Sequence, residues 1–243
     1  MRVPTRRRDT GTAAADQVEQ LDDQRQIIGH ARLAGWSGVT FAVLFVLGLV
    51  LVRQAPGLDA PDEAYVSFYA AGGGNTLMIL GLYLVPFAGI AYLWHMNATR
   101  TLLQVLRPRS WSQIPHWLNL ASGIVFVAML FVGAAAAGAV ALLARFSAAP
   151  LPSPDIARAL TAVGYATVFV YGVRVAGIYM ITTTGLARSA GLLPRPAVVV
   201  SYLAAAFLLV STTFHPAILL VFPGWVLLVS ILLLARRPSG AIP

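Results

Sequence analysis

The chain has 243 residues, of which 58% are hydrophobic and 11% are charged, and its mean hydropathy is +0.76. This apolar fraction exceeds what a soluble domain of that length needs for its core, so the composition predicts a membrane protein. The chain contains no cysteine, which excludes disulfides, thiolate metal sites and thiol nucleophiles. All its basic residues are arginine, a usage that favours a bacterial source with a GC-rich coding sequence.

Residues 1–32 are mostly polar and lack the short apolar core of a signal peptide. We expect a cytoplasmic tail there, either partly disordered or folded into an amphipathic surface helix. The rest of the chain holds six apolar windows of about the length needed to cross a bilayer. They are residues 33–52, 76–96, 117–143, 159–187, 197–214 and 217–234. The sequence therefore predicts an all-α, polytopic membrane bundle of six transmembrane helices over 33–235, followed by a short cytoplasmic tail at 236–243.

Arginine residues are concentrated on alternate joints between the predicted spans. Thirteen of them flank the first, second, fourth and sixth spans on one common side, whereas the opposite joints hold only Arg53, Arg145 and Arg158 beside four acidic residues. Because positive loops are retained in the cytoplasm, both termini are predicted to be cytoplasmic in a multi-pass protein of the cell membrane. The arginines behind the net charge of +8 are then expected to contact anionic lipid head groups at the inner face, and we expect no nucleic-acid partner.

The longest joint on the other side, residues 54–75, predicts an interfacial helix. Pro61 followed by Asp62 and Glu63 is typical of a first helical turn. Tyr65 and other aromatic residues would then lie at head-group depth, and the glycines at 72–74 would end this helix.

A weak internal repeat links the spans in pairs. Four residues of the first span match four of the third without gaps: Ser37, Gly38, Phe41 and Gly48 match Ser122, Gly123, Phe126 and Gly133. Residues 88–90 of the second span similarly match residues 176–178 of the fourth. We interpret this as a duplicated two-helix hairpin, which aligns Pro86 with Arg174.

Arg174 is the one charged residue predicted to lie deep within a span. Tyr83, Tyr171 and Tyr179 are the hydroxyl groups expected near it, while Pro86 and Pro223 predict helix kinks that free backbone carbonyls. Two interpretations stay open. Arg174 either binds an anionic solute or lipid head group, or it is a packing clamp that bonds carbonyls of neighbouring helices.

The remaining polar residues predict no catalytic site. The spans contain no carboxylate, so no nucleophile, base and acid can be assembled, and we expect no enzyme, no metal and no cofactor. Asn75, Asn119, His95 and His116 fall near the predicted span ends, where snorkelling toward the interface is the ordinary explanation. A bis-histidine haem site made by His95 and His116 is a minor alternative.

Residues 155–234 resemble the C-terminal half of an uncharacterised family of bacterial six-span membrane proteins of the actinobacterial type. The resemblance rests on residues 171–174 (Tyr-Gly-Val-Arg), 191–195 (Gly-Leu-Leu-Pro-Arg) and 221–228, which include Pro223-Gly224-Trp225. It implies six spans but transfers no activity, ligand or site residue.

Two functions remain as hypotheses from the sequence. The first is a binding or scaffold component of the membrane that docks lipids, a membrane-protein partner or a second copy of the chain. The second is a small permease or carrier that binds an anionic solute or lipid head group near Arg174. They differ in whether Arg174 faces a wet cavity or a dry helix contact.

Overall fold

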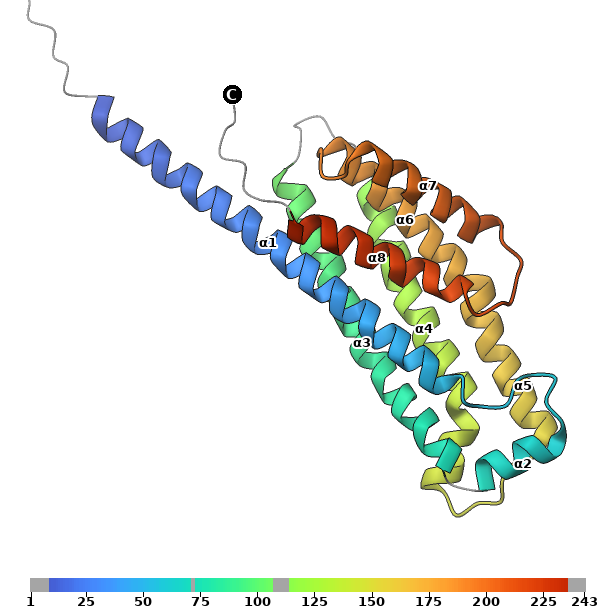
Figure 1. Ribbon diagram of the computed structural model, residues 1–243. Coiled ribbons are helices and arrows are strands. Elements are labelled where there is room, and N and C mark those ends of the chain that lie inside the picture. Colours follow the sequence, from blue (N-terminus) through green and yellow to red (C-terminus); the bar gives the residue numbers. More distant parts are fainter. Residues whose placement is uncertain (1–8, 71–72, 107–113, 236–243) are drawn as a thin grey trace, which may run out of the picture.

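The computed structural model describes residues 9–70, 73–106 and 114–235, and every regular element in this part of the chain is a helix. The elements are α1 (Asp9–Val52), α2 (Asp62–Ala70), α3 (Gly73–Val105), α4 (Ile114–Phe146), α5 (Pro154–Tyr165), the π-helix η1 (Ala166–Gly172), α6 (Val173–Ser189), α7 (Arg195–Val210) and α8 (Ile218–Ala235). The predicted all-α class is confirmed (Figure 1).

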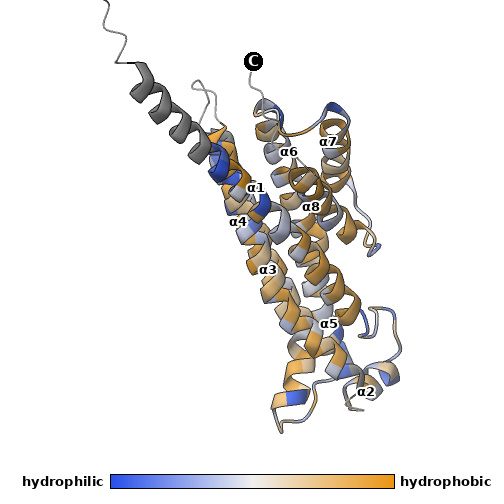
Figure 2. Ribbon diagram, turned by 60° about the vertical axis from the view of Figure 1, so that its left-hand side comes forward, coloured by the Kyte–Doolittle hydropathy of each residue, from blue (hydrophilic) through white to orange (hydrophobic). Residues whose placement is uncertain are grey.

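Five helical segments within the described residues are long and apolar enough to cross a membrane, which indicates a membrane protein. They are Gln24–Val52, Asn75–Val105, His116–Phe146, Pro154–Ser189 and Ile218–Ala235. Apolar residues dominate the helices along the bundle, and hydrophilic residues gather toward its ends (Figure 2).

The predicted fifth span, 197–214, is shorter than expected. Helix α7 has 16 residues and ends at Val210, which gives a length of about 24 Å against a hydrocarbon thickness of roughly 30 Å. Residues 211–217 form a non-helical loop, which we call the hairpin tip, before α8 begins at Ile218. The prediction ran past the end of the helix because residues 211–214, Ser-Thr-Thr-Phe, interrupt the apolar window only weakly, whereas the structure ends α7 at Val210 and Ser211 is already extended.

Most of the predicted N-terminal tail is helical and continuous with the first candidate span, which begins at Gln24. Helix α1 has 44 residues and begins at Asp9, so no break separates residues 9–32 from the first predicted span. Its N-terminal part extends beyond the other helices (Figure 1). Residues 1–8 and 236–243 lie outside the described part of the chain.

The 54–75 joint contains a short helix as predicted, α2, with Asp62 and Glu63 in its first turn, and its interfacial position stays a prediction. Tyr65 and Tyr69 are buried against the bundle instead of lying at its surface. The predicted role of the glycine run was to end α2. Gly73 is in fact the first residue of the long helix α3. We call the part of the bundle next to α2 the α2 end.

The core is an aromatic cluster contributed by α1, α3, α4, α6 and α8. Its ring centroids lie 4.5 to 6.4 Å apart, mostly in tilted or edge-to-face pairs, which suits the quadrupoles of aromatic rings. The members are Phe41, Tyr92, Phe126, Tyr179, Phe222 and Trp225. This cluster joins α8 to the four longer membrane segments.

Two antiparallel hairpins pack side by side, one of α1 with α3 and one of α4 with α5, η1 and α6. In the second hairpin an ideal Cβ on Gly164 would lie 2.6 Å from the carbonyl oxygen of Gly133, so only glycine permits this approach. In the first hairpin Gly48 lies against Gly81, with an ideal Cβ 3.5 Å from its carbonyl oxygen. Gly48 and Gly133 are partners in the predicted repeat, and the duplication itself stays a prediction.

Several polar residues expected at the membrane surface are buried. His95 is 0% exposed, and Asn75, Asn119 and His116 are also buried. The Asn119 side-chain nitrogen donates to the hydroxyls of Thr182 and Thr183 at 3.0 and 2.7 Å, linking α4 to α6. The helices extend further along the chain than the apolar windows suggested, so these residues lie inside the bundle where neighbouring helices supply hydrogen-bond partners.

Candidate functional site

Arg174 lies in the first turn of α6 and is half-buried. One terminal nitrogen, Nη1, donates a hydrogen bond to the carbonyl oxygen of Phe169 at 2.7 Å. The other, Nη2, donates to the carbonyl oxygen of Ser211 at 2.8 Å, directly after the end of α7. The guanidinium therefore joins the α5–α6 segment to the hairpin tip, as the packing interpretation requires.

The π-helix η1 is what allows Arg174 to reach Phe169. Within η1 the backbone bonds span five residues, as in the bond from the N–H of Val173 to the carbonyl of Val168. This wider turn leaves carbonyls inclined away from the ordinary helical direction, where a side chain five residues later can bond to them. No sequence feature indicates η1, because its residues are the apolar and small residues usual in a membrane helix.

The three tyrosines predicted around Arg174 are not gathered there. Tyr83 and Tyr171 are 55% and 61% exposed, so both lie on the outer surface of the bundle. Tyr179 is 1% exposed and belongs to the aromatic core beside Tyr92. None of these hydroxyls is bonded to Arg174, so the predicted tyrosine-lined anion site is not assembled.

Both predicted kink residues lie inside helices that continue past them. Pro86 lies within α3 and Pro223 within α8. Pro223 is buried next to Phe222 and Trp225, so this proline contributes to the aromatic core rather than to the surroundings of Arg174.

A partly open apolar cavity of about 120 Å³ lies among α1, α3, α4, α5 and η1. Phe45, Leu49 and Leu130 line it from the longer helices, and Phe214 with Pro216 close it from the hairpin tip. Sequence reasoning missed this cavity. It forms where the short α7–α8 hairpin ends part-way along the bundle and leaves the α2 end to the other helices (Figure 1).

Small residues make room for the cavity. Gly133, Ala134 and Ala137 of α4 and Gly164 of α5 line it, so along this part of its wall no large side chain fills the space. The run of small residues from 133 to 139 predicts close helix contacts, and the contact between Gly133 and Gly164 satisfies that prediction. The same run also lines the cavity.

Arg174 supports the cavity indirectly. Its bond to Ser211 fixes the start of the hairpin tip, and the side chains of Phe169 and Phe214, whose ring centroids are 5.9 Å apart, both line the cavity. The arginine itself is not among the lining residues. Its role in the structure is therefore to hold one wall in place.

Arg53 is the charged residue that lines the cavity. Its backbone N–H bonds the carbonyl of Leu49 at 3.1 Å, so the residue continues the last turn of α1 toward the α2 end. Its side chain is exposed and makes no hydrogen bond or ion pair with any residue of the described ranges. A free cation thus stands next to an otherwise apolar space.

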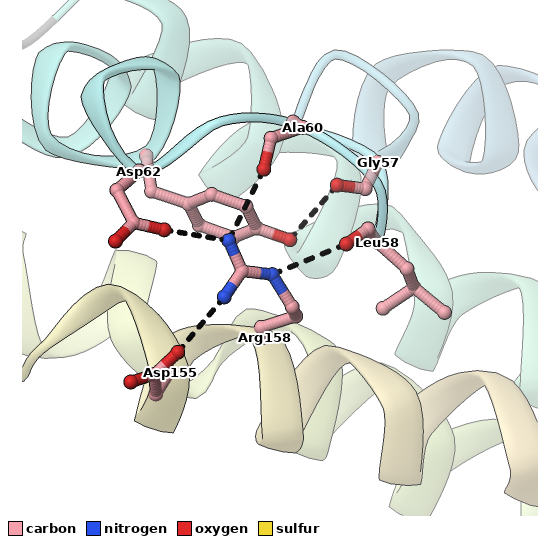
Figure 3. A network of polar contacts seen from close by, with 7 residues as sticks. Gly57, Leu58, Ala60, Asp62, Asp155 and Arg158 are labelled. Atoms are coloured by element: carbon pink, nitrogen blue, oxygen red, sulfur yellow. Dashed lines mark hydrogen bonds and ion pairs between the residues drawn. The ribbon is translucent and has the colours of Figure 1, made fainter.

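Arg158 has the opposite environment at the same end of the bundle (Figure 3). Its guanidinium is 2.8 Å from the Asp62 carboxylate and 2.9 Å from that of Asp155, and it donates to the carbonyls of Leu58 and Ala60 at 3.1 Å each. These contacts fasten the loop before α2 to α5.

Tyr65 and Tyr69 complete the packing of α2. The Tyr65 ring lies under the Arg158 guanidinium, 5.1 Å from its centroid, and its hydroxyl donates to the Gly57 carbonyl. Burial raises the pKa of Tyr69 to about 12, so this phenol is neutral at physiological pH. Arg158 therefore holds α2 against α5 at the α2 end of the bundle.

His95 is held by a backbone carbonyl. Its Nδ1 donates to the carbonyl oxygen of Ala34 at 2.7 Å, and its Nε2 has no partner among the described residues. Gly38 permits this approach, because an ideal Cβ there would lie 2.6 Å from Nδ1. The described residues contain no group of three or more metal-binding side chains.

Comparisons with models of protein families, with curated proteins and with solved structures find no match to this chain. The resemblance of residues 155–234 to a bacterial six-span family accordingly remains a prediction.

Proposed function

We propose that the chain is a multi-pass membrane binding protein that accommodates the hydrocarbon part of a lipid-like molecule in its apolar cavity. The observation that carries the proposal is the cavity of about 120 Å³ between α1, α4 and η1. Ligand sites are typically concave and mostly apolar with few polar groups, and this cavity has that character. The proposal belongs to the class of binding components predicted from the composition.

The walls of the cavity come from three separate parts of the fold. This arrangement favours a cavity that the fold itself maintains, rather than a chance packing defect. Glycine and alanine residues of α4 form one wall, and the side chains of Phe45 and Leu49 from α1 form another. The hairpin tip forms the third, and Arg174 links it to η1 by one hydrogen bond to Ser211 and one to Phe169. The mostly apolar lining favours an apolar guest.

The permease hypothesis has less support from the same contacts. It requires a guanidinium directed toward an anionic solute, but each terminal nitrogen of Arg174 donates to a backbone carbonyl of the bundle. The tyrosines expected to complete such a site lie elsewhere. Arg174 as a packing clamp is therefore the interpretation that we adopt.

Native mass spectrometry of the protein released from lipid nanodiscs tests this function. The variant Ala134→Leu adds a branched side chain to the half-buried cavity wall, and Ala135→Leu adds the same side chain on the exposed face of the same helix. We expect the parent and Ala135→Leu to retain a lipid-like molecule that Ala134→Leu has lost.

Circular dichroism on the three proteins shows whether each one is folded. Equal retention of lipid by a folded Ala134→Leu protein contradicts the proposed function. Retention of a protein partner in place of any lipid also contradicts it and favours a scaffold.

A further inference from the structure

We infer that the cavity binds an anionic phospholipid, with one acyl chain inside it and the negatively charged head group paired with Arg53. The inference rests on the proposed function and adds the chemical class of the ligand. It concerns a residue of the first membrane helix that lies apart from the Arg174 clamp.

Arg53 lines the cavity near the α2 end. Phe45 and Arg53 both line it and both belong to the end of α1, eight residues apart, which corresponds to a rise of about 12 Å. The cavity thus extends from a charged group near the α2 end toward the hairpin tip at Phe214 and Pro216. An amphiphile has the same order of parts, with a polar head followed by a hydrocarbon chain.

The positive charge of Arg53 has no hydrogen-bond or ion-pair partner among the described residues. Of the arginines near the α2 end, Arg158 is fully engaged with Asp62, Asp155 and two carbonyls. Arg145 is exposed and does not line the cavity. Arg53 alone combines a free guanidinium with a place in the cavity wall, within the described residues.

An anionic head group would complement the positive charge of Arg53. No carboxylate lines the cavity, and Asp62, close to Arg53 in the sequence, is paired with Arg158. A neutral hydrocarbon would leave Arg53 without a partner, and a small soluble anion would leave the apolar walls unfilled. An anionic lipid satisfies both, because its phosphate forms a charge-assisted hydrogen bond with Arg53 while its hydrocarbon chain contacts the apolar walls.

The size of the cavity limits how much of the lipid enters. Its volume of about 120 Å³ is close to the roughly 150 Å³ of an engineered apolar cavity that binds benzene. The space therefore takes a segment of one acyl chain, while the second chain remains in the surrounding bilayer. Selection among lipids then depends on the head group.

Competition between two lipids in nanodiscs tests this inference. Phosphatidylglycerol and phosphatidylcholine with identical acyl chains are mixed in equal amounts, and native mass spectrometry records which lipid each protein retains. We expect the parent to retain phosphatidylglycerol preferentially. In Arg53→Gln that preference should fall about tenfold or more, the effect of losing one charge-assisted hydrogen bond, while a lipid of either class is still retained.

Arg145→Gln is the matched control, since it removes an exposed arginine of the same end that does not line the cavity. It should keep the parental preference. An unchanged preference in Arg53→Gln, or an equal loss in Arg145→Gln, overturns the inference. Retention of a free fatty acid instead of a phospholipid overturns it as well.

Failure of the inference can be separated from failure of the proposed function. If Ala134→Leu loses bound lipid but Arg53→Gln leaves the preference unchanged, the cavity binds a chain without selecting its charge. If Ala134→Leu retains lipid as the parent does, the proposed function fails and the head-group inference fails with it.

Discussion

Arg174 donates a hydrogen bond to the backbone carbonyl of Ser211, 37 residues later in the chain, at a distance of 2.8 Å. Ser211 directly follows the last residue of α7, so its carbonyl is one of those that an ending helix leaves without an intrahelical partner. The contact satisfies a carbonyl and a buried cation together. It also determines where the hairpin tip lies against η1.

Replacing Arg174 by glutamine should destabilise the protein. The variant loses two charge-assisted hydrogen bonds of about 1.5–3 kcal/mol each, partly offset by the cost of about 2.5–3.5 kcal/mol for placing arginine in a membrane. We expect a net loss of about 1–3 kcal/mol, measured as a lower Tm in nanodiscs. Arg188→Gln, at the exposed end of α6, should leave the Tm unchanged. An unaltered Tm in Arg174→Gln would show that the clamp contributes nothing to stability.

Replacing Gly164 by alanine should destabilise the second hairpin. The new Cβ would lie 2.6 Å from the Gly133 carbonyl oxygen, which forces the helices apart at a cost of about 1–3 kcal/mol. Gly185→Ala should be neutral or stabilising by up to about 1 kcal/mol, because its Cβ meets only ordinary contact at 3.5 Å and alanine favours the helix. Thermal unfolding of both variants measures the difference, and effects of equal sign would count against the close contact.

Replacing Asn119 by alanine should weaken the contact of α4 with α6. The side-chain nitrogen donates to Thr182 and Thr183, and hydrogen bonds between membrane helices contribute about 0.6 kcal/mol on average. We expect a loss of about 1 kcal/mol in a chemical-denaturation experiment. Asn97→Ala removes an exposed asparagine of α3 as a control and should leave stability unchanged.

Replacing Arg158 by methionine should loosen α2 without unfolding the bundle. The variant loses the ion pairs to Asp62 and Asp155 and the bonds to the loop before α2. Hydrogen exchange followed by mass spectrometry should show faster exchange in residues 54–70 and unchanged exchange in α4 and α6. Arg145→Gln should show neither change. Faster exchange throughout the variant would mean that Arg158 stabilises the whole fold.

The all-α class and most membrane helices could be predicted because each depends on a continuous property of the chain. About 20 apolar residues in a row must satisfy their backbone bonds internally to enter a bilayer, and a helix does so locally. The same reasoning failed at 197–214. The predicted window included the hydroxyl residues 211–213, but the chain leaves the helix after Val210 and forms the hairpin tip.

Arg174 is the part of the candidate site that could be predicted from the sequence. Arg174 is conspicuous because a charge within an apolar stretch needs partners, but those partners are backbone carbonyls of Phe169 and Ser211, which carry no sequence signature. Tyr83 and Tyr171 were predicted site residues because of their hydroxyl groups, but both lie on the outer surface of the bundle. Arg53 gave no signal, because an arginine at a span end is ordinary.

The sequence by itself determined that this chain forms apolar helices, and it identified Arg174 as a charge that must be satisfied within them, because both follow from the local cost of exposing polar groups to lipid. The tertiary structure decided that α7 and α8 form a short hairpin, that Arg174 holds its tip, and that a cavity remains beside Arg53. These features depend on which helix faces which and at what height. They are set by the packing of residues such as Gly133 and Gly164, which are distant in the sequence.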